Sequence, residues 1–368
     1  MNEDKATRYH RLKRQAGIAS LAWTVVLLVG LLVTGWSGWL RDGAERLLPF
    51  APVLAYVLLL TVINEVVGLP LAFYSGWLVE RRYDLSNERL WSWLRDQVKS
   101  FGIGVVLGGG GASLIYRIMR LFPDRWWLVS GLVFALLIVG LTNLAPVLLL
   151  PLFYSVRPLD RDGLRERLLA LADRAGARVL GAYEWGLGDK TKKANAALAG
   201  LGSTRRILVS DTMLAEYPDE EIEVVLAHEL AHYVHRDIWK GIAFESALVL
   251  AGFFLASRVL LALAGPAGLR GAEDVAGLPL LLLSAGAVSL LMMPVAHAMS
   301  RRLERNADRF ALDLTRNPAA FISAMRRLGA QNLAEEHPTT IVKWLFYSHP
   351  PIRERIAAAQ ALLPPTGA

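Results

Sequence analysis

Residues 220–250 read EEIEVVLAHELAHYVHRDIWKGIAFESALVL, and this stretch decides how the rest of the chain is interpreted. It places a His-Glu-x-x-His pattern directly before a long apolar run. The pattern is typical of hydrolytic metal sites, whereas the apolar run is typical of a membrane span. The stretch therefore raises the hypothesis of a hydrolytic metal site beside a membrane.

The composition is that of a membrane protein. Of the 368 residues, 54% are hydrophobic, and the mean hydropathy of +0.36 is too apolar for an ordinary cytosolic globule. The formal net charge is +7, and in a membrane protein a basic excess usually reflects cytoplasmic loops rather than binding to nucleic acid. The chain has no cysteine, which excludes disulfides and thiolate ligands, so only His, Asp and Glu can bind a metal.

Six apolar runs are long enough to cross a bilayer, which takes roughly 20 helical residues. The first run is too long for a removable signal peptide and lacks a small-residue cleavage pattern after it, so we expect a retained anchor. We divide the chain into a membrane region with four spans (1–153), a polar catalytic subdomain (154–239), two further spans (240–299) and a polar C-terminal part (300–368). The predicted spans are 17–40, 50–79, 101–121, 126–153, 240–264 and 278–299.

Lysine and arginine predict the orientation of these spans, because they collect in cytoplasmic loops. The N-terminal KATRYHRLKR (5–14) and the loop ERRYDLSNERLWSWLRDQVKS (80–100) are strongly basic, whereas the connections on the other side carry little net positive charge. With six spans, both termini, the subdomain and the C-terminal part all fall on the cytoplasmic side.

The polar segment 154–239 is predicted to fold as a small α+β unit. DRDGLRERLLALADRAG (160–176) has a helical apolar period and ends at Gly176, a typical stop signal. Short β-prone runs follow within 177–187 and 202–214. Pro218 and three acidic residues then precede an apolar-periodic run, so the histidine pair should lie inside a helix. The predicted fold class is mainly α: a polytopic membrane protein of about six spans, plus a cytoplasmic α+β zincin (gluzincin-like) subdomain with a small sheet.

On such a helix His228 and His232 are one turn apart and project from the same face, so both imidazoles can reach one Zn²⁺ ion. Glu229 lies next to that face, where it can polarise a water molecule without binding the metal. His235 is too far from His228 to share the ion, about 10 Å along the helix axis. A metzincin would need Gly at position 235 and His at 238, and the sequence has His235 and Ile238, so that class is excluded.

A third ligand is predicted within SRRLERNADRF (300–310). Glu304 and Asp308 are i and i+4 on one helical face, so Glu304 could bind the metal while Asp308 accepts a hydrogen bond from a ligand imidazole. The alternative is a solvated charge cluster beside the membrane. Two histidines, one glutamate and a water form the open ligand set of a catalytic zinc rather than the closed set of a structural one.

Five segments carry a family resemblance and follow one another in the expected order: YSGWLVERRYDLSN (74–87), NAALAGLGSTRRILVSDTML (195–214), HELAH (228–232), SRRLERNADRFA (300–311) and YSHPPIRERI (347–356). Together they resemble the CAAX prenyl protease 1 family of integral membrane zinc metallopeptidases. The resemblance implies a chamber enclosed by the spans, with the metal site at its cytoplasmic end. Eukaryotic members have one more N-terminal span, so this chain resembles a shorter, bacterial-type relative of the inner (plasma) membrane.

The resemblance also implies roles for single residues. One Zn²⁺ per chain would be held by His228, His232 and Glu304. Glu229 would act as general base and later as general acid, and Asp308 would orient a ligand.

Three further residues receive their roles from the resemblance. Asn195 would hold the substrate backbone beside the scissile peptide, and His349 would hydrogen bond to the tetrahedral oxyanion. Arg355 would help to hold that loop or a substrate carboxylate. A His-Pro-Pro turn before a helix is equally typical of a rigid capping loop, so this alternative stays open.

The predicted function is that of an integral membrane zinc metalloendopeptidase, with substrate lying extended along an edge strand near 195–209. The expected partners are a peptide or protein substrate, lipidated or membrane-associated ones included, and the lipid bilayer, with no nucleic acid. Two alternatives remain: a membrane quality-control metalloprotease of the heat-shock type, and a transporter or scaffold with a structural metal. Neither the natural substrate nor the oligomeric state follows from the sequence.

Overall fold

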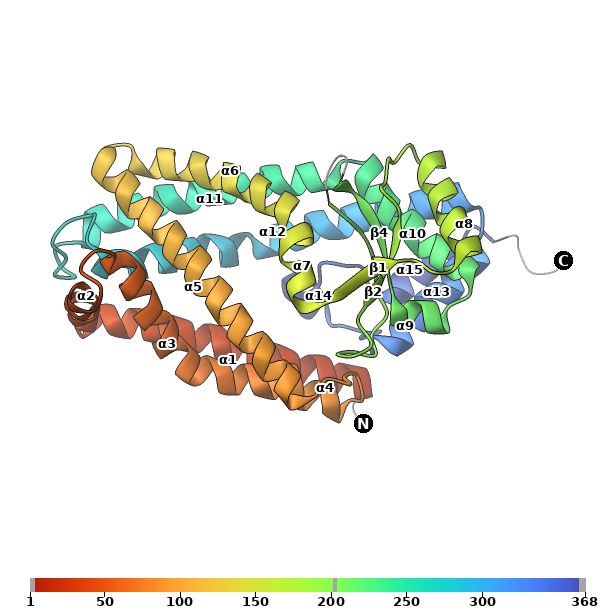
Figure 1. The fold of residues 1–368 in the computed structure, drawn as a ribbon, viewed down its shortest axis with the longest axis horizontal. Coiled ribbons are helices and arrows are strands. Elements are labelled where there is room, and N and C mark those ends of the chain that lie inside the picture. The colour runs from red at the N-terminus through yellow and green to blue at the C-terminus, as the bar shows by residue number, and fades with distance from the viewer. Residues whose placement is uncertain (1–3, 201–203, 364–368) are drawn as a thin grey trace.

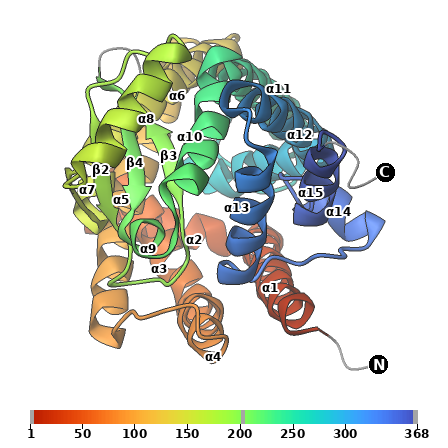
Figure 2. The ribbon, with the colours of Figure 1, turned by 90° about the vertical axis from the view of Figure 1, so that its right-hand side faces the viewer.

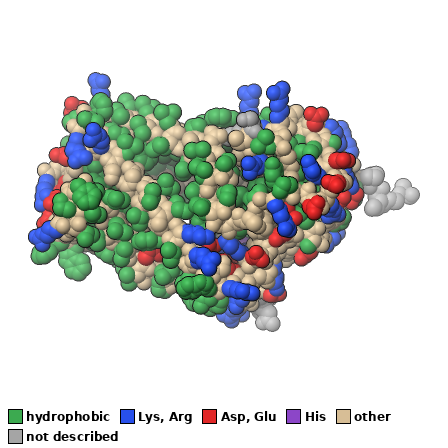
Figure 3. All heavy atoms as spheres, in the orientation of Figure 1, with side chains coloured by type: hydrophobic (Ala, Val, Ile, Leu, Met, Phe, Trp, Pro, Cys, Tyr) green, Lys and Arg blue, Asp and Glu red, His purple; other side chains and the backbone are tan. Residues whose placement is uncertain are grey.

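The spanning helices and the polar parts of the chain occupy opposite ends of an elongated molecule in the computed structural model (Figure 1). The structure describes residues 4–200 and 204–363. On the face shown in Figure 3, hydrophobic side chains cover the helical end, whereas charged side chains gather at the α/β end and at the opposite tip. This distribution is the one expected of a membrane protein with a polar domain on one side.

The described residues form six helices that are long and apolar enough to cross a membrane, which confirms the predicted number. Three of these spans are built from consecutive helical pieces that continue one another. The spans are α1 (Lys5–Val33), α3 (Pro52–Phe73) with η1 (Tyr74–Leu78) and α4 (Val79–Arg82), α5 (Leu90–Leu121), α6 (Trp126–Leu148) with α7 (Leu150–Phe153), α11 (Asp237–Leu263), and η3 (Val275–Gly277) with α12 (Leu278–Thr315).

Three of the helices that contain the predicted spans have bounds that differ from those of the apolar runs. The first was expected at 17–40, but α1 ends at Val33 because Gly35 turns the chain with φ +74, and a separate helix α2 (Trp36–Leu47) follows. Helix α5 begins at Leu90, and α12 continues to Thr315. Hydropathy marks only the lipid-embedded part of a helix, and good helix formers extend these helices beyond it. The segment that carries Glu304 therefore belongs to the same helix as the sixth span.

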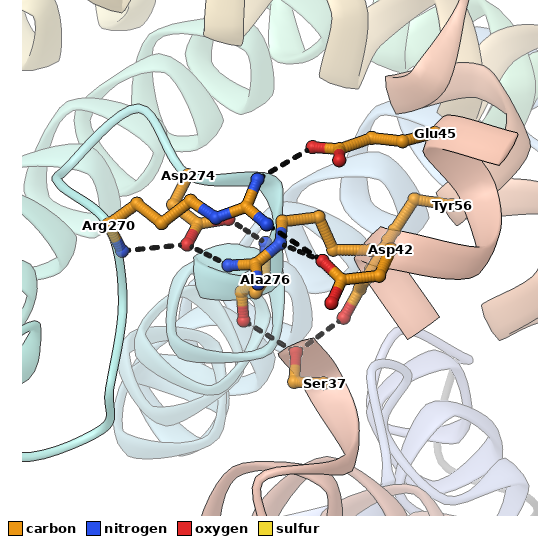
Figure 4. Close-up of polar contacts among 8 residues, drawn as sticks. Ser37, Asp42, Glu45, Tyr56, Arg270, Asp274 and Ala276 are labelled. Atoms are coloured by element: carbon orange, nitrogen blue, oxygen red, sulfur yellow. Dashed lines mark hydrogen bonds and ion pairs between the residues drawn. The ribbon is translucent and has the colours of Figure 1, made fainter. Parts of the chain in front are cut away.

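A polar network ties α2 to the connection between α11 and α12, at the end of the molecule farthest from the sheet (Figures 1 and 4). The Nη1 atom of Arg41 lies 2.6 Å from Oδ2 of the buried Asp274. The Ser37 hydroxyl donates to the carbonyl of Ala276 at 2.6 Å and lies 2.7 Å from the Tyr56 hydroxyl. Because removing one partner of a buried ion pair leaves an uncompensated charge, this network fixes the far end of the bundle.

The α/β part contains a four-stranded sheet with the order β1-β2-β4-β3. The central strands β2 and β4 are parallel, and each edge strand is antiparallel to its neighbour. The two β-prone runs predicted from the sequence form β2 and β4, and β3 supplies an edge strand within 195–209 as predicted. The strands are β1 (Ser155–Pro158), β2 (Ala182–Gly186), β3 (Ala196–Ala199) and β4 (Arg206–Ser210).

Helix α10 (Asp219–Val234) lies between the sheet and the C-terminal helices (Figure 2). It begins after Pro218 with three acidic residues in its first turn, as predicted, and these favour the positive end of the helix dipole. Ile222, Leu226 and Leu230 recur every four residues and are fully buried, so one stripe of α10 forms the core. Besides α10, the helices that contribute buried side chains to this core are α8 (Asp162–Arg174), α9 (Asp211–Glu216), α12, α13 (Pro318–Gln331) and α15 (Ile352–Gln360).

Candidate metal centre and active site

The sequence-predicted ligands come together in space. His228 and His232 project from α10, and Glu304 projects from α12; one ligand atom of each lies within 4.8 Å of the others. The Nε2 atom of His228 is 3.2 Å from Glu304 Oε2, and that of His232 is 3.4 Å from Glu304 Oε1. The two rings stand nearly perpendicular, at 88°. These three side chains could hold one metal ion.

The Nδ1 atom of each imidazole, on the side of the ring away from Glu304, contacts a carboxylate. Nδ1 of His228 lies 2.9 Å from Asp308 Oδ1, and Nδ1 of His232 lies 3.0 Å from Asp237 Oδ2. When each Nδ1–H donates to its carboxylate, the lone pair of Nε2 is left facing Glu304. The arrangement thus fixes the tautomer that a metal ligand requires.

Asp237 was missed by the sequence reasoning. It is the first residue of α11. His235 and Arg236 separate α10 from α11, and Arg236 adopts the left-handed conformation with φ 56. That single residue redirects the chain so that Asp237 turns back toward His232. A spacing of five residues carries no recognisable signal unless this break is known.

Arg355 of α15 forms a two-pronged ion pair with Asp308. Its Nε lies 2.9 Å from Oδ2 and its Nη2 lies 2.5 Å from Oδ1. Nη2 is also 3.3 Å from Nδ1 of His228, because both groups donate to the same carboxylate oxygen. Both Arg355 and Asp308 are buried. The guanidinium therefore acts on the orientation of His228 through Asp308, a contact that the sequence did not predict.

The protonation of these side chains reflects their burial and their partners. Burial lowers the pKa of His228, but hydrogen bonds to Asp308 and Glu304 outweigh it and raise the value to about 9. The pKa of His232 is also raised: burial opposes the shift, and Glu304 and Asp237 favour it. In the metal-free protein His228 therefore retains its second proton above neutral pH, and His232 keeps its proton to a higher pH than an ordinary imidazole.

Glu229 faces a cavity of about 370 Å³ next to the candidate ligands. Its carboxylate forms no hydrogen bond or ion pair within the part of the chain that the structure describes. Burial raises the pKa of Glu229, and the neighbouring His228 and His232 oppose that shift. A carboxylate with a raised pKa and no fixed partner can accept a proton and release it again.

Asn195 and His349 line the same cavity. The backbone of Asn195 is fixed just before β3 by two hydrogen bonds with Ser210, of 3.0 and 2.9 Å, while its carboxamide forms no hydrogen bond with a described residue. Nε2 of His349 lies 3.4 Å from Glu304 Oε1, and its Nδ1 lies 2.9 Å from the Ser348 hydroxyl. The structure thus brings all eight predicted site residues into one region.

The N-terminal part of α1 also borders the cavity, which sequence reasoning did not anticipate. His10 lies 3.0 Å from the carbonyl of Leu333 and lines the cavity. Arg14 forms a 2.6 Å ion pair with the buried Glu335, which also accepts a hydrogen bond from the Tyr347 hydroxyl. The partners are more than 300 residues apart, so no local pattern could have revealed them.

Comparison with known proteins identifies the family. Residues 158–363 match the family model of peptidase family M48. The chain belongs to peptidase family M48. Residues 2–155 match a second family model, described as the CAAX prenyl protease N-terminal region with five membrane helices. Among the described residues of this part, four spans are long and apolar enough to cross a membrane.

Relatives of this M48 chain cover most of its length. The uncharacterized metalloprotease YhfN of Bacillus subtilis is 31% identical over 361 residues, which make up 96% of this chain and 84% of the relative. CAAX prenyl protease 1 of Saccharomyces cerevisiae is 26% identical over 328 residues, or 84% of this chain and 72% of the yeast protein.

A solved structure shows the same fold. The crystal structure of S. mikatae Ste24p superposes with a TM-score of 0.84 at 24% identity, covering 96% of this chain and 87% of that one. This M48 chain is therefore a membrane metalloprotease related to the CAAX prenyl proteases. The predicted family, fold class and enzyme class are confirmed.

Proposed function

We propose that this protease hydrolyses peptide bonds with one zinc ion held by His228, His232 and Glu304. The observation that carries the proposal is the convergence of both Nε2 atoms on the buried Glu304, at 3.2 and 3.4 Å from its two carboxylate oxygens. A buried carboxylate needs positive charge beside it: in the metal-free protein the protonated imidazoles supply that charge, and a bound metal ion would supply it in their place. Two imidazoles and one carboxylate are the ligand set of catalytic zinc sites.

A bound zinc ion would polarise the scissile carbonyl and make a water molecule more acidic. We assign to Glu229 the transfer of a proton from the attacking water to the leaving amine. Its free carboxylate and raised pKa support this role. No side chain of this site is a nucleophile in the proposal, so no covalent acyl-enzyme forms. Asp308 and Asp237 hold the imidazoles, and Arg355 holds Asp308.

We assign substrate contacts to Asn195, His349 and β3. The free carboxamide of Asn195 can bind a substrate backbone group, and the imidazole of His349 can donate to the developing oxyanion. Strand β3 pairs on one side only, with β4, so an extended peptide can add to its open edge. The side chains of the substrate would then alternate toward and away from the cavity.

The proposed substrate is a peptide or protein at the membrane, lipidated ones included. The name of the yeast relative supports the lipidated class, whereas broad specificity would be expected of the alternative, a membrane quality-control metalloprotease. We place the protein in a bacterial inner membrane with both termini and the zinc site in the cytoplasm. The basic N-terminus and the basic segment 80–100 lie at the same end of the molecule as the sheet, which supports this orientation (Figure 1).

The Glu229→Gln variant tests the function. It should retain one zinc per chain and lose cleavage of an internally quenched peptide, because the amide keeps the shape of the side chain but cannot carry the proton. If the protein were a transporter or scaffold with a structural metal, this variant would change neither its transport activity nor its stability. Any residual cleavage of the peptide would also be the same in the variant and in the original protein. In native membranes the same variant should retain bound substrates, which can be identified by mass spectrometry.

A further inference from the structure

Helix α14 (Thr340–Phe346) presents an apolar face that no described residue covers. Ile341 is 71% exposed and Trp344 is 53% exposed. The two residues are three positions apart, so they lie on one side of the helix. This helix ends three residues before His349, the residue to which we assign the oxyanion.

Helix α14 lies at the level where the spanning helices enter the α/β part (Figure 1). Arg301, the first arginine after the apolar part of α12, donates from Nη1 to the carbonyls of Lys343 and Tyr347 at 3.0 and 2.6 Å. Phe346, at the end of α14, lines a cavity together with Ile18 of α1 and Met293 of α12. These contacts hold the helix beside the membrane-embedded parts of α1 and α12.

Two arginines continue the lipid-facing side of α12. Leu291 is 77% exposed and Val295 is 49% exposed, as expected of side chains that contact lipid tails. Arg302 follows seven residues after Val295, two turns along the same face, and Arg305 lies one turn further. Neither arginine forms a hydrogen bond or an ion pair within residues 4–200 and 204–363. Along the helix axis Arg302 lies about 5 Å and Arg305 about 9 Å beyond Met299, the last residue of the apolar part, which places both near the headgroup layer.

We propose that α14 is an interfacial anchor whose occupant is the bilayer itself. Ile341 and Trp344 enter the boundary between headgroups and acyl chains, and Arg302 and Arg305 bind the phosphates of anionic phospholipids. A protein partner could also cover an apolar face, but two arginines at the same level that have no partner among the described residues favour an anionic lipid surface. Through the hydrogen bonds of Arg301, the anchor sets the height of the His349 loop above the membrane.

The absence of cysteine makes this surface easy to label. An Ile341→Cys variant is coupled to an environment-sensitive fluorophore and placed in nanodiscs of phosphatidylcholine and phosphatidylglycerol. Lipids with a nitroxide near the top of the acyl chain should quench it more than lipids with a nitroxide at the chain end, and aqueous iodide should have little effect. A label at Glu166→Cys, exposed on α8, should be quenched by iodide alone. A label at Leu291→Cys should be quenched by lipids with the nitroxide at the chain end.

The arginines are tested with nitroxide-labelled headgroup classes. Phosphatidylglycerol should quench the Ile341→Cys label more efficiently than phosphatidylcholine. This preference should fall about fivefold in Arg302→Gln and about fivefold in Arg305→Gln, because the attraction of one arginine to an anionic surface has an effect of that size. The matched control is Arg316→Gln, at the far end of α12, which should leave the preference unchanged.

Two outcomes would overturn the inference. A label at position 341 that iodide quenches as strongly as the one at position 166 would show that α14 is in water. A label shielded from both iodide and the nitroxide lipids would show that protein covers it. The readout is independent of catalysis, so failure of the proposed peptidase function would leave this test intact.

Discussion

The Nδ1 atom of His232 lies 3.0 Å from Oδ2 of Asp237, the residue with which the spanning helix α11 begins. This contact joins a candidate metal ligand to a membrane helix across one turn of chain. Asp237 is itself buried, and its other oxygen accepts a hydrogen bond of 2.8 Å from Lys240. The position of the imidazole therefore depends on where α11 begins.

Replacing Asp237 with alanine should weaken zinc binding by about 10- to 100-fold, because His232 then loses the acceptor that fixes its tautomer and ring orientation. The affinity can be measured by competition with a fluorescent chelator. Asp313→Ala is the matched control, since that exposed carboxylate on α12 forms no ion pair with a described residue. Equal affinity in the two variants would mean that Asp237 serves α11 rather than the metal.

A second prediction concerns His349. The His349→Ala variant should lose about 10²-fold or more in kcat and keep its zinc, because an oxyanion donor acts in the transition state and does not hold the metal. KM should change little. His337→Ala, which removes a histidine outside the catalytic cavity, is the control. Loss of zinc from His349→Ala would favour the alternative of a rigid structural loop.

The site divides into a part that sequence periodicity predicts and a part that it does not. His228, His232 and the pair Glu304 and Asp308 follow from helical spacing, since residues four apart share a face in any helix. The sequence could also predict that α10 begins after Pro218. These features depend only on local geometry, which the order of residues determines.

The unpredicted features depend on backbone breaks or distant contacts. Asp237 reaches His232 because Arg236 adopts a left-handed conformation that arginine rarely takes. The pair of Arg14 and Glu335 joins the first helix to the segment before α14, and nothing local to either residue indicates it. Hydropathy predicts only the apolar part of α12, residues 278–299, whereas the helix continues to Thr315.

The third prediction is that zinc binds more tightly as the pH rises from about 6.5 to about 9. The pKa of His228 in the metal-free folded protein is raised from 6.5 to about 9, and zinc must displace that proton. Each pH unit in this window should raise the apparent association constant about 10-fold for each displaced proton.

The same shift in the pKa of His228 makes the stability of the metal-free protein depend on pH. A raised pKa stabilises the folded state fully below pH 6.5, and this stabilisation is lost as the pH rises through about 9. The increase in Tm on adding zinc should therefore grow across this window, as thermal unfolding in detergent can measure. An increase in Tm that stays constant with pH would contradict the protonation of His228.

The last prediction tests the edge strand β3 through the substrate rather than the enzyme. A peptide that pairs with β3 uses its backbone N–H groups at alternate residues, because in an antiparallel pair every second residue is hydrogen bonded to the neighbouring strand. N-methylation at one of these positions should raise KM about 10-fold or more, the combined loss of a hydrogen bond and a steric clash, with little effect on kcat. Methylation one residue along serves as the control and should leave KM near its original value. A series in which KM is insensitive to methylation at every position would exclude β-strand addition and leave the side-chain contacts of the cavity to hold the substrate.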